Sequence, residues 1–322
     1  MKQHLDTSLL QQHALLFLLK FLKEQNYRFT VITPLTHERI IKRKESLSSR
    51  STTLRDIFGW NLTFAPEDLD PQLFVLLEKA DLIHIENNQC FSKIRVASLE
   101  DELFIHSAFP TVENDAVFFG PDTYRFYYHL KQYLLTQSPS CQRAVELCCG
   151  TSAVAISIAK RFPSISEVFT ADINPKALFY SQVNQQFNGL ENIYPTHSNL
   201  FSDLEGNFDL IFANPPYLMD IQERQYRHGG NNLDGTELSF NILREAVKRL
   251  APNGSIFLYT GISIGQYGNK FLEAIQSWII NYPTLKCSYE EIDPDVFGEE
   301  LEQPNYQHIE RIAVVLVKIT AI

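Results

Sequence analysis

The sequence is short of glycine and of positive charge. Only 13 of its 322 residues are glycine, which excludes an architecture built on glycine-rich linkers. Its 28 lysines and arginines stand against 38 aspartates and glutamates, a formal net charge of −10. Because non-specific binding to nucleic acid depends on neutralising phosphates with cationic side chains, this average disfavours such binding unless a local basic patch supplies it.

Cysteine and long apolar runs are also scarce. The five cysteines are odd in number, contain no Cys-x-x-Cys pair and join no Cys/His cluster with metal-ligand spacing. We therefore expect no disulfide framework, no metal site and a reducing, cytoplasmic location. The most apolar N-terminal stretch, residues 14–22, contains Lys20 and is too short to span a bilayer. We expect one face of an amphipathic helix there, and no membrane contact.

The length predicts two domains at about 150 residues each, and residues 1–108 form the first, an accessory or substrate-recognition domain. Apolar spacing predicts a helix over Ser8–Glu24 and a second helix beginning near Pro71. The β-like runs Leu82–Ile85 and Ile94–Val96, separated by a polar turn, predict a hairpin. This α+β pattern is similar to a winged helix.

A basic stretch at residues 39–55 interrupts the acidic average of the chain. Its cationic residues are Arg39, Lys42, Arg43, Lys44, Arg50 and Arg55. One interpretation is a local contact with nucleic acid, and the other is a solvated basic face on a packing domain.

Residues 109–322 form the second predicted domain, in which strands and helices alternate. The predicted strands are Ala144–Leu147, Val168–Thr170, Asn192–Tyr194, Phe208–Ala213, Gly254–Tyr259 and Arg311–Ile319. The predicted helices are Ser152–Arg161, Pro175–Phe187, Glu237–Leu250 and Lys270–Ile280. Alternation of this kind predicts an α/β fold with a mostly parallel sheet and helices on both faces. Ligands of such sheets bind outside the carboxyl ends of the strands, which directs attention to the loops that follow.

Two features follow the first two of these strands. The segment Glu146–Ala153 ends a strand and opens a helix, so backbone N–H groups can meet a ligand there; a tight turn in any α/β protein has a similar appearance. Asp172 closes the next strand, at roughly the separation typical of a carboxylate that binds both ribose hydroxyls. The alternative role for Asp172 is to cap the helix that starts near Pro175.

The most specific motif is Asn214-Pro215-Pro216-Tyr217, directly after the apolar strand Phe208–Ala213. Two consecutive prolines fix an extended backbone that lacks donors. This leaves carbonyl groups free to accept hydrogen bonds from one NH2 group. Tyr217 adds an aromatic face for a planar group, so the motif favours a planar amide or aromatic amine as ligand.

With these motifs, residues 113–320 resemble the class I S-adenosylmethionine-dependent methyltransferases of the NPPY type, which include HemK-like glutamine methyltransferases and adenine-amine methyltransferases. The segment Gly120–Thr123 resembles the Pro-Asp/Glu-Thr segment before the core of the HemK-like enzymes. The resemblance implies a Rossmann-like sheet and S-adenosylmethionine as cofactor. Implied cofactor-binding residues are Glu146, Cys148, Gly150, Asp172, Ile173, Asn199, Leu200 and Asn214. Implied catalytic residues are Asn214, Pro215 and Tyr217, and implied substrate-binding residues are Asp122, Tyr124 and Pro216.

The methyl acceptor is left open between several classes. The first expectation is a protein glutamine side chain, and the second is an exocyclic amine of a base in RNA or DNA. A small-molecule amine and a non-catalytic cofactor-binding scaffold are further alternatives. The acidic stretch at residues 289–302, which carries no basic residue, is interpreted either as a solvated insertion or as a cover of the site that faces a cationic substrate.

Overall fold

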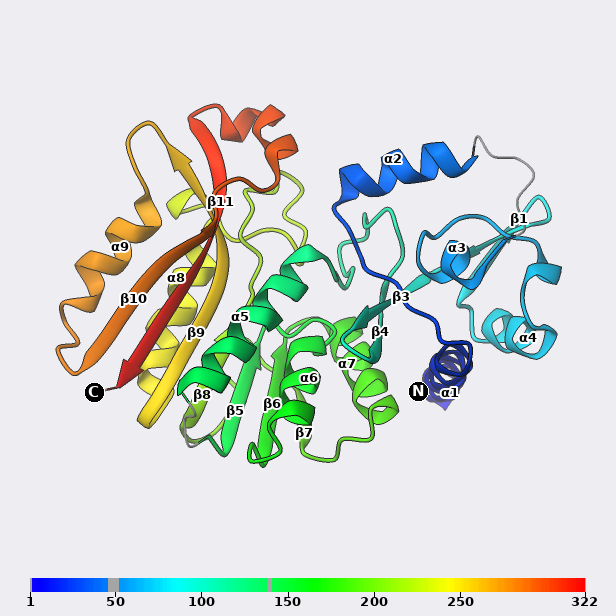
Figure 1. Cartoon of the computed structure of the whole chain (residues 1–322), viewed down its shortest axis with the longest axis horizontal. Coiled ribbons are helices and arrows are strands. Elements are labelled where there is room, and N and C mark those ends of the chain that lie inside the picture. Colours follow the sequence, from blue (N-terminus) through cyan, green and yellow to red (C-terminus); the bar gives the residue numbers. More distant parts are fainter. Residues whose placement is uncertain (1, 46–51, 138–140, 322) are drawn as a thin grey trace.

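A computed structural model describes residues 2–45, 52–137 and 141–321 and shows a smaller N-terminal lobe beside a larger one (Figure 1). The helices of the N-terminal lobe are α1 (Lys2–Glu24), α2 (Pro34–Glu45), α3 (Leu54–Phe58), η1 (Pro66–Asp68) and α4 (Pro71–Lys79). Its strands are β1 (Ile83–Glu86), β2 (Gln89–Ser92), β3 (Ile94–Leu99) and β4 (Glu102–Ser107). The predicted helices at Ser8–Glu24 and Pro71 are therefore present, the first with an earlier start.

The hairpin predicted from Leu82–Ile85 and Ile94–Val96 is wrong, because the two runs belong to different two-stranded sheets. β1 pairs with β2, and β3 pairs with β4. Asn87 and Asn88 both have positive φ, of 50° and 61°, which makes a two-residue turn that closes the first hairpin early. The run Ile94–Val96 then pairs with the strand that follows it in the chain.

Among the described residues, the apolar core of the N-terminal lobe is continuous with that of the larger lobe. Buried side chains of α1, α4 and β4 belong to the same cluster as those of α5, α6 and α7 in the larger lobe. Across this junction the backbone N–H of Ile105 donates to Asn184 Oδ1 at 2.9 Å. The predicted domain boundary near residue 108 follows β4, and packing is continuous across it.

The larger lobe contains a seven-stranded sheet in the order β10-β11-β9-β8-β5-β6-β7. The strands are β5 (Arg143–Leu147), β6 (Glu167–Asp172), β7 (Ile193–His197), β8 (Phe208–Ala213), β9 (Leu250–Gly265), β10 (Leu285–Asp293) and β11 (Ile309–Ala321). The helices are α5 (Pro121–Gln137), α6 (Ala153–Arg161), α7 (Pro175–Phe187), η2 (Leu233–Gly235), α8 (Glu237–Ala246), η3 (Val247–Arg249), α9 (Lys270–Ile279), η4 (Gly298–Glu302) and η5 (Pro304–Tyr306). Strands β5 to β9 are parallel, whereas β11 is antiparallel to both β9 and β10.

Successive side chains of the central strands enter opposite cores, as the two-residue period of a strand requires. On β9, Phe257 and Tyr259 pack with α5–α7, whereas Ile256 and Leu258 pack with α8 and α9. Helices therefore cover both faces of the sheet (Figure 1), and the predicted α/β fold class is confirmed. Among the helices of the described residues, none is long and apolar enough to cross a membrane.

Candidate active site

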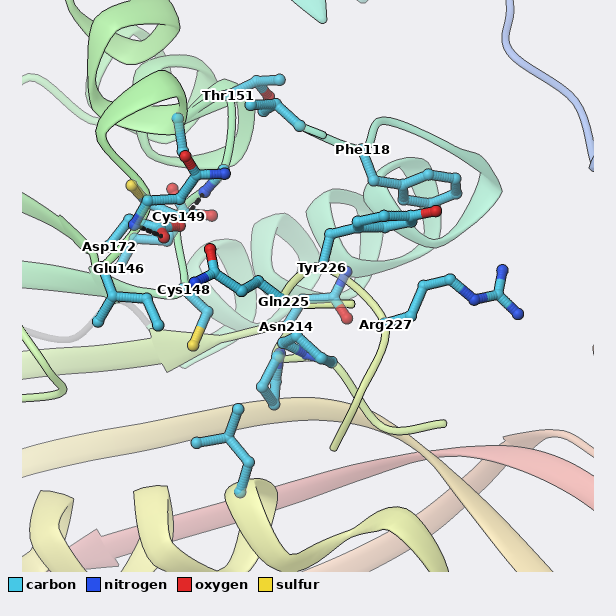
Figure 2. Close-up of a pocket in the computed structure, with 18 of the residues that line it drawn as sticks. Phe118, Glu146, Cys148, Cys149, Thr151, Asp172, Asn214, Gln225, Tyr226 and Arg227 are labelled. Carbon is cyan, nitrogen blue, oxygen red and sulfur yellow. Dashed lines mark hydrogen bonds between the residues drawn. The ribbon is translucent and has the colours of Figure 1, made fainter. Parts of the chain in front are cut away.

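A pocket opens at the carboxyl ends of β5, β6 and β8, where parallel strands bring their following loops together (Figure 2). The predicted residues that line it are Asp122, Glu146, Cys148, Gly150, Asp172, Ile173, Asn199, Leu200, Asn214, Pro215, Pro216 and Tyr217. Tyr124 is not among the lining residues. Its hydroxyl accepts a hydrogen bond from the backbone N–H of Val31 at 3.0 Å, so it serves the junction with the N-terminal lobe instead of the pocket.

The loop after β5 is tied to the end of β6. Gly150, whose φ is +51°, donates its N–H to Asp172 Oδ2 at 3.0 Å. The second oxygen of Asp172 accepts from the backbone N–H of Asn174 at 2.9 Å. Asn174, and not Asp172, caps α7 with its side chain, so the capping alternative for Asp172 is excluded. Each carboxylate oxygen keeps a second lone pair for a ligand hydroxyl.

Two acidic side chains, Glu146 and Asp172, line this side of the pocket. Glu146 is 4% exposed and accepts a hydrogen bond from the N–H of Ala155 at 3.0 Å. Burial, with a further contribution from the charge of Asp172, raises the pKa of Glu146 to about 8. Burial also raises the pKa of Asp172. A cationic ligand would stabilise the ionised form of both groups.

The Asn214–Tyr217 segment leaves β8 and crosses the floor of the pocket. Tyr217 is only 6% exposed, and its ring packs against Gly261 of β9, where a Cβ would lie 2.1 Å from the ring. Phe297 meets the same ring at a steep angle, with centroids 6.0 Å apart. Most of the ring is therefore used in packing, and a small part of it remains to face an acceptor.

Asp122 connects this segment to α5 and β9. Its Oδ2 accepts the Tyr217 hydroxyl at 2.5 Å, and its Oδ1 accepts the Tyr259 hydroxyl at 2.7 Å. Arg125 reaches the same carboxylate at 3.1 Å and Asp293 at 3.1 Å. Burial raises the pKa of Tyr217 and of Tyr259, so both hydroxyls stay protonated and donate. Asp122 thus fixes the position of Tyr217, and with it the motif, through this hydrogen bond.

The sequence did not single out four further residues that line the pocket, namely Phe118, Gln225, Tyr226 and Arg227, whereas Phe297, which also lines it, lies in the acidic stretch that one interpretation places over the site. Figure 2 shows Phe118, Gln225, Tyr226 and Arg227 among the side chains around the pocket. One sequence signal could have indicated three of these residues. It is the run Gln225-Tyr226-Arg227, which places an aromatic and a cationic residue shortly after the Pro-Pro-Tyr motif.

Part of the acidic stretch 289–302 covers the loop that follows the motif. Glu300 forms an ion pair with Arg227, and Phe297 lines the pocket. Just beyond the stretch, the Tyr306 hydroxyl accepts from the N–H of Met219 at 2.8 Å. The start of the stretch is the edge strand β10. Most acidic side chains of the stretch are exposed, as a solvated insertion predicts, while Phe297 and Glu300 contact the pocket and its loop.

Within the described residues, the basic stretch 39–55 comprises the end of α2 and residues 52–55, which lead into α3. Arg39 and Lys42 are exposed. Lys44 pairs with Asp56 at 2.6 Å, and Arg55 lies over the ring of Phe29. Arg50 lies outside the described residues.

The fold and the pocket contain the features on which the predicted resemblance rests. They are a mostly parallel sheet with β11 antiparallel, an acidic residue at the end of β6 and an Asn-Pro-Pro-Tyr segment after β8. Residues 130–266 match the family model "Methyltransferase small domain", and the predicted resemblance is confirmed for this part of the chain.

Named relatives agree with this assignment. The ribosomal protein uL3 glutamine methyltransferase of Neisseria meningitidis serogroup A is 33% identical over 128 residues, which cover 37% of this chain and 42% of that protein. The release factor glutamine methyltransferase of Borreliella burgdorferi is 32% identical over 132 residues, covering 38% and 46%. The chain thus aligns with less than half the length of these two relatives. Wild-type Trm5b from Pyrococcus abyssi superposes with a TM-score of 0.48 at 15% identity, covering 74% of this chain and 62% of that chain.

Proposed function

We propose that the protein is an S-adenosylmethionine-dependent N-methyltransferase whose acceptor is the side-chain amide of a glutamine in another protein. One observation carries the proposal. Asp172, the Glu146–Gly150 loop and the Asn214–Tyr217 segment, which lie far apart in the sequence, line the same pocket. The names of the curated relatives support the choice of glutamine.

The residues of the pocket fit the cofactor. Asp172 has lone pairs available for the two ribose hydroxyls. Ile173, which is 46% exposed, and Leu200 offer apolar contacts for a purine ring, and Asn199 offers an amide for its exocyclic amine. Glu146 is buried, and a ligand that carries positive charge would stabilise its ionised form. When bound, the cofactor supplies an electrophilic methyl group on a sulfonium.

The Asn-Pro-Pro-Tyr segment supplies the acceptor side of the reaction. An amide nitrogen is a poor nucleophile because its lone pair is delocalised into the carbonyl. The Asn214 side-chain oxygen and the Pro215 carbonyl can accept its two N–H bonds, which localises the lone pair and stabilises the charge that develops on nitrogen. Holding the nitrogen in line with the methyl group supplies further rate acceleration.

Calorimetry tests the cofactor site. We expect S-adenosylmethionine to bind the parent protein and to bind Asp172→Ala far more weakly. Asp203→Ala, a change at an exposed carboxylate, is the matched control and should bind like the parent. Absence of cofactor binding by the parent protein would contradict the whole proposal.

Methyl transfer tests the acceptor. Labelled cofactor is incubated with purified uL3, with release factors and with total RNA, and the label is followed in each. Label on a glutamine of a protein supports the proposal. Label confined to RNA would instead support exocyclic-amine methylation, for which the exposed Arg39 and Lys42 on α2 are the supporting observation. In that case, reversing these two charges should lower RNA labelling and leave cofactor affinity unchanged.

A further inference from the structure

One glutamine of this chain lies in its own candidate active site. Gln225, in the loop that follows the Asn-Pro-Pro-Tyr segment, lines the same pocket as Asn214 and Cys148. Figure 2 shows its side chain extending into the pocket from the side of Asn214 toward Cys148. An amide is therefore present where the proposed reaction requires one.

The backbone on either side of Gln225 is held by the neighbouring side chains. Arg224 binds Asp220 through its backbone N–H and its guanidinium group, both at 2.9 Å. The Tyr226 hydroxyl donates to the backbone carbonyl of Thr111 at 2.5 Å. Arg227 pairs with Glu300. The first contact is local to the loop, whereas those to Thr111 and Glu300 reach two separate parts of the chain and fix the loop by tertiary structure.

The amide group of Gln225 has no hydrogen-bond partner among the described residues. Within the part of the chain that the structure describes, this exposed side chain makes no hydrogen bond or other polar contact with the protein, although the residue lines the pocket. Gln185 shows the usual alternative, because its amide nitrogen donates to the carbonyls of Leu190 and Ile193, both at 2.9 Å. A free NH2 group next to Asn214 is available to the oxygens that the proposed mechanism assigns to the acceptor.

We propose that Gln225 is a methyl acceptor in cis, so that the protein methylates its own active-site loop. The inference rests on the proposed function. The Gln225 nitrogen forms a bond to the methyl carbon as the carbon–sulfur bond of the sulfonium breaks. The amide proton leaves to water, and S-adenosylhomocysteine is released. A tethered acceptor competes well with an external one, because effective molarities of oriented intramolecular groups reach about 10⁵ M or more.

Mass spectrometry of the purified chain tests the inference. The protein is incubated with cofactor that carries a deuterated methyl group and then digested after glutamate, which yields the peptide Arg224–Glu237. We expect this peptide to gain the mass of one labelled methyl group, with fragment ions locating it on Gln225. The rate constant should not change when the protein is diluted, because the reaction is intramolecular.

Two variants make the result specific. Gln225→Glu keeps the shape of the side chain but has no NH2 group, and it should lose the label entirely. Gln222→Glu alters an exposed glutamine of the same loop that does not line the pocket, and it should be labelled like the parent.

Three results would overturn self-methylation: an unlabelled peptide from a preparation that binds the cofactor and methylates an external protein, label at Gln222, or a rate proportional to protein concentration. Failure of the parent to bind the cofactor would overturn the proposed function as well, and so the two failures are distinguishable.

Discussion

Replacing Asp122 by alanine should destabilise the protein and disable the Asn-Pro-Pro-Tyr segment together. The carboxylate is the acceptor for the hydroxyls of Tyr217 and Tyr259, at 2.5 and 2.7 Å. Tyr217 is 6% exposed and Tyr259 is 0% exposed, so water cannot take the place of the lost acceptor. Arg125 keeps its second partner, Asp293, at 3.1 Å.

The expected loss of stability follows from the two tyrosine hydroxyls that are left without a hydrogen-bond acceptor. Leaving one buried donor unsatisfied costs about 1–3 kcal/mol, so two cost about 2–6 kcal/mol. The side chain of Arg125 is 36% exposed and adds little, because exposed ion pairs contribute at most about 1 kcal/mol. Since a domain is stable by only about 5–15 kcal/mol, the loss of Asp122 removes a large share of the free energy of unfolding.

Urea unfolding measures this cost, and a triple variant checks its cause. In Asp122→Ala/Tyr217→Phe/Tyr259→Phe the two donors are absent together with their acceptor, so stability should recover by at least about 1 kcal/mol relative to Asp122→Ala. Methyl transfer should fall in Asp122→Ala while cofactor affinity, which we propose to depend on Asp172, is retained. A single variant as stable as the parent, or a triple variant no more stable than the single one, would refute the reasoning.

Three other changes test separate parts of the site. Asn214→Ala should abolish labelled-methyl transfer with cofactor affinity changed only a few-fold by calorimetry; surviving transfer would refute the role of the amide oxygen. Because burial raises the pKa of Glu146 from 4.5 to about 8, the native state holds a proton that the unfolded state releases, so this group lowers stability progressively as pH rises between these values. The free energy of unfolding of the parent and of Glu146→Gln is measured at pH 5 and at pH 9. At pH 9 the variant should become more stable relative to the parent, by an amount on the order of a few kcal/mol. An equal difference in stability at both pH values would contradict the raised pKa. Glu300→Gln should weaken the ion pair with Arg227, whose remaining partner is Asp220 at 3.6 Å. The change should raise KM for the acceptor without changing cofactor affinity. An unchanged KM would show that Glu300 does not order the loop.

The parallel core could be predicted because its signals are local. The strand Phe208–Ala213 and the helix Pro175–Phe187 have the predicted bounds. The strand is a continuous apolar run, as expected for a strand buried on both faces. The helix begins at a proline preceded by Asn174, which caps it. Once these strands are predicted, Asp172 and Asn214 can be identified as site candidates, because they lie at the ends of β6 and β8.

Elements that depend on distant partners were not predictable in this way. Helix α5 has its buried residues Asp122, Phe126, Leu130 and Leu134 four positions apart, yet many polar and aromatic residues lie between them and obscure the helical period. β10 alternates charged and apolar residues at the edge of the sheet, where pairing with β11 decides its conformation. Likewise, Tyr226 reaches the pocket because its hydroxyl binds the carbonyl of Thr111, a contact that no local pattern encodes.

The shortage of glycine has its sharpest consequence in the loop after β5. Cys148 and Ser152 have φ values of +53° and +55°, a conformation that costs non-glycine residues about 1–2 kcal/mol each. Contacts within the fold must maintain it, and they include the bond from the Gly150 N–H to Asp172 and the bond from the Ser152 N–H to the Cys149 carbonyl at 2.8 Å. Asp172 therefore both holds the loop and lines the pocket. Weak cofactor binding by Asp172→Ala would combine the two effects, whereas Asp172→Asn, which keeps one acceptor oxygen, separates the loop contact from the loss of charge.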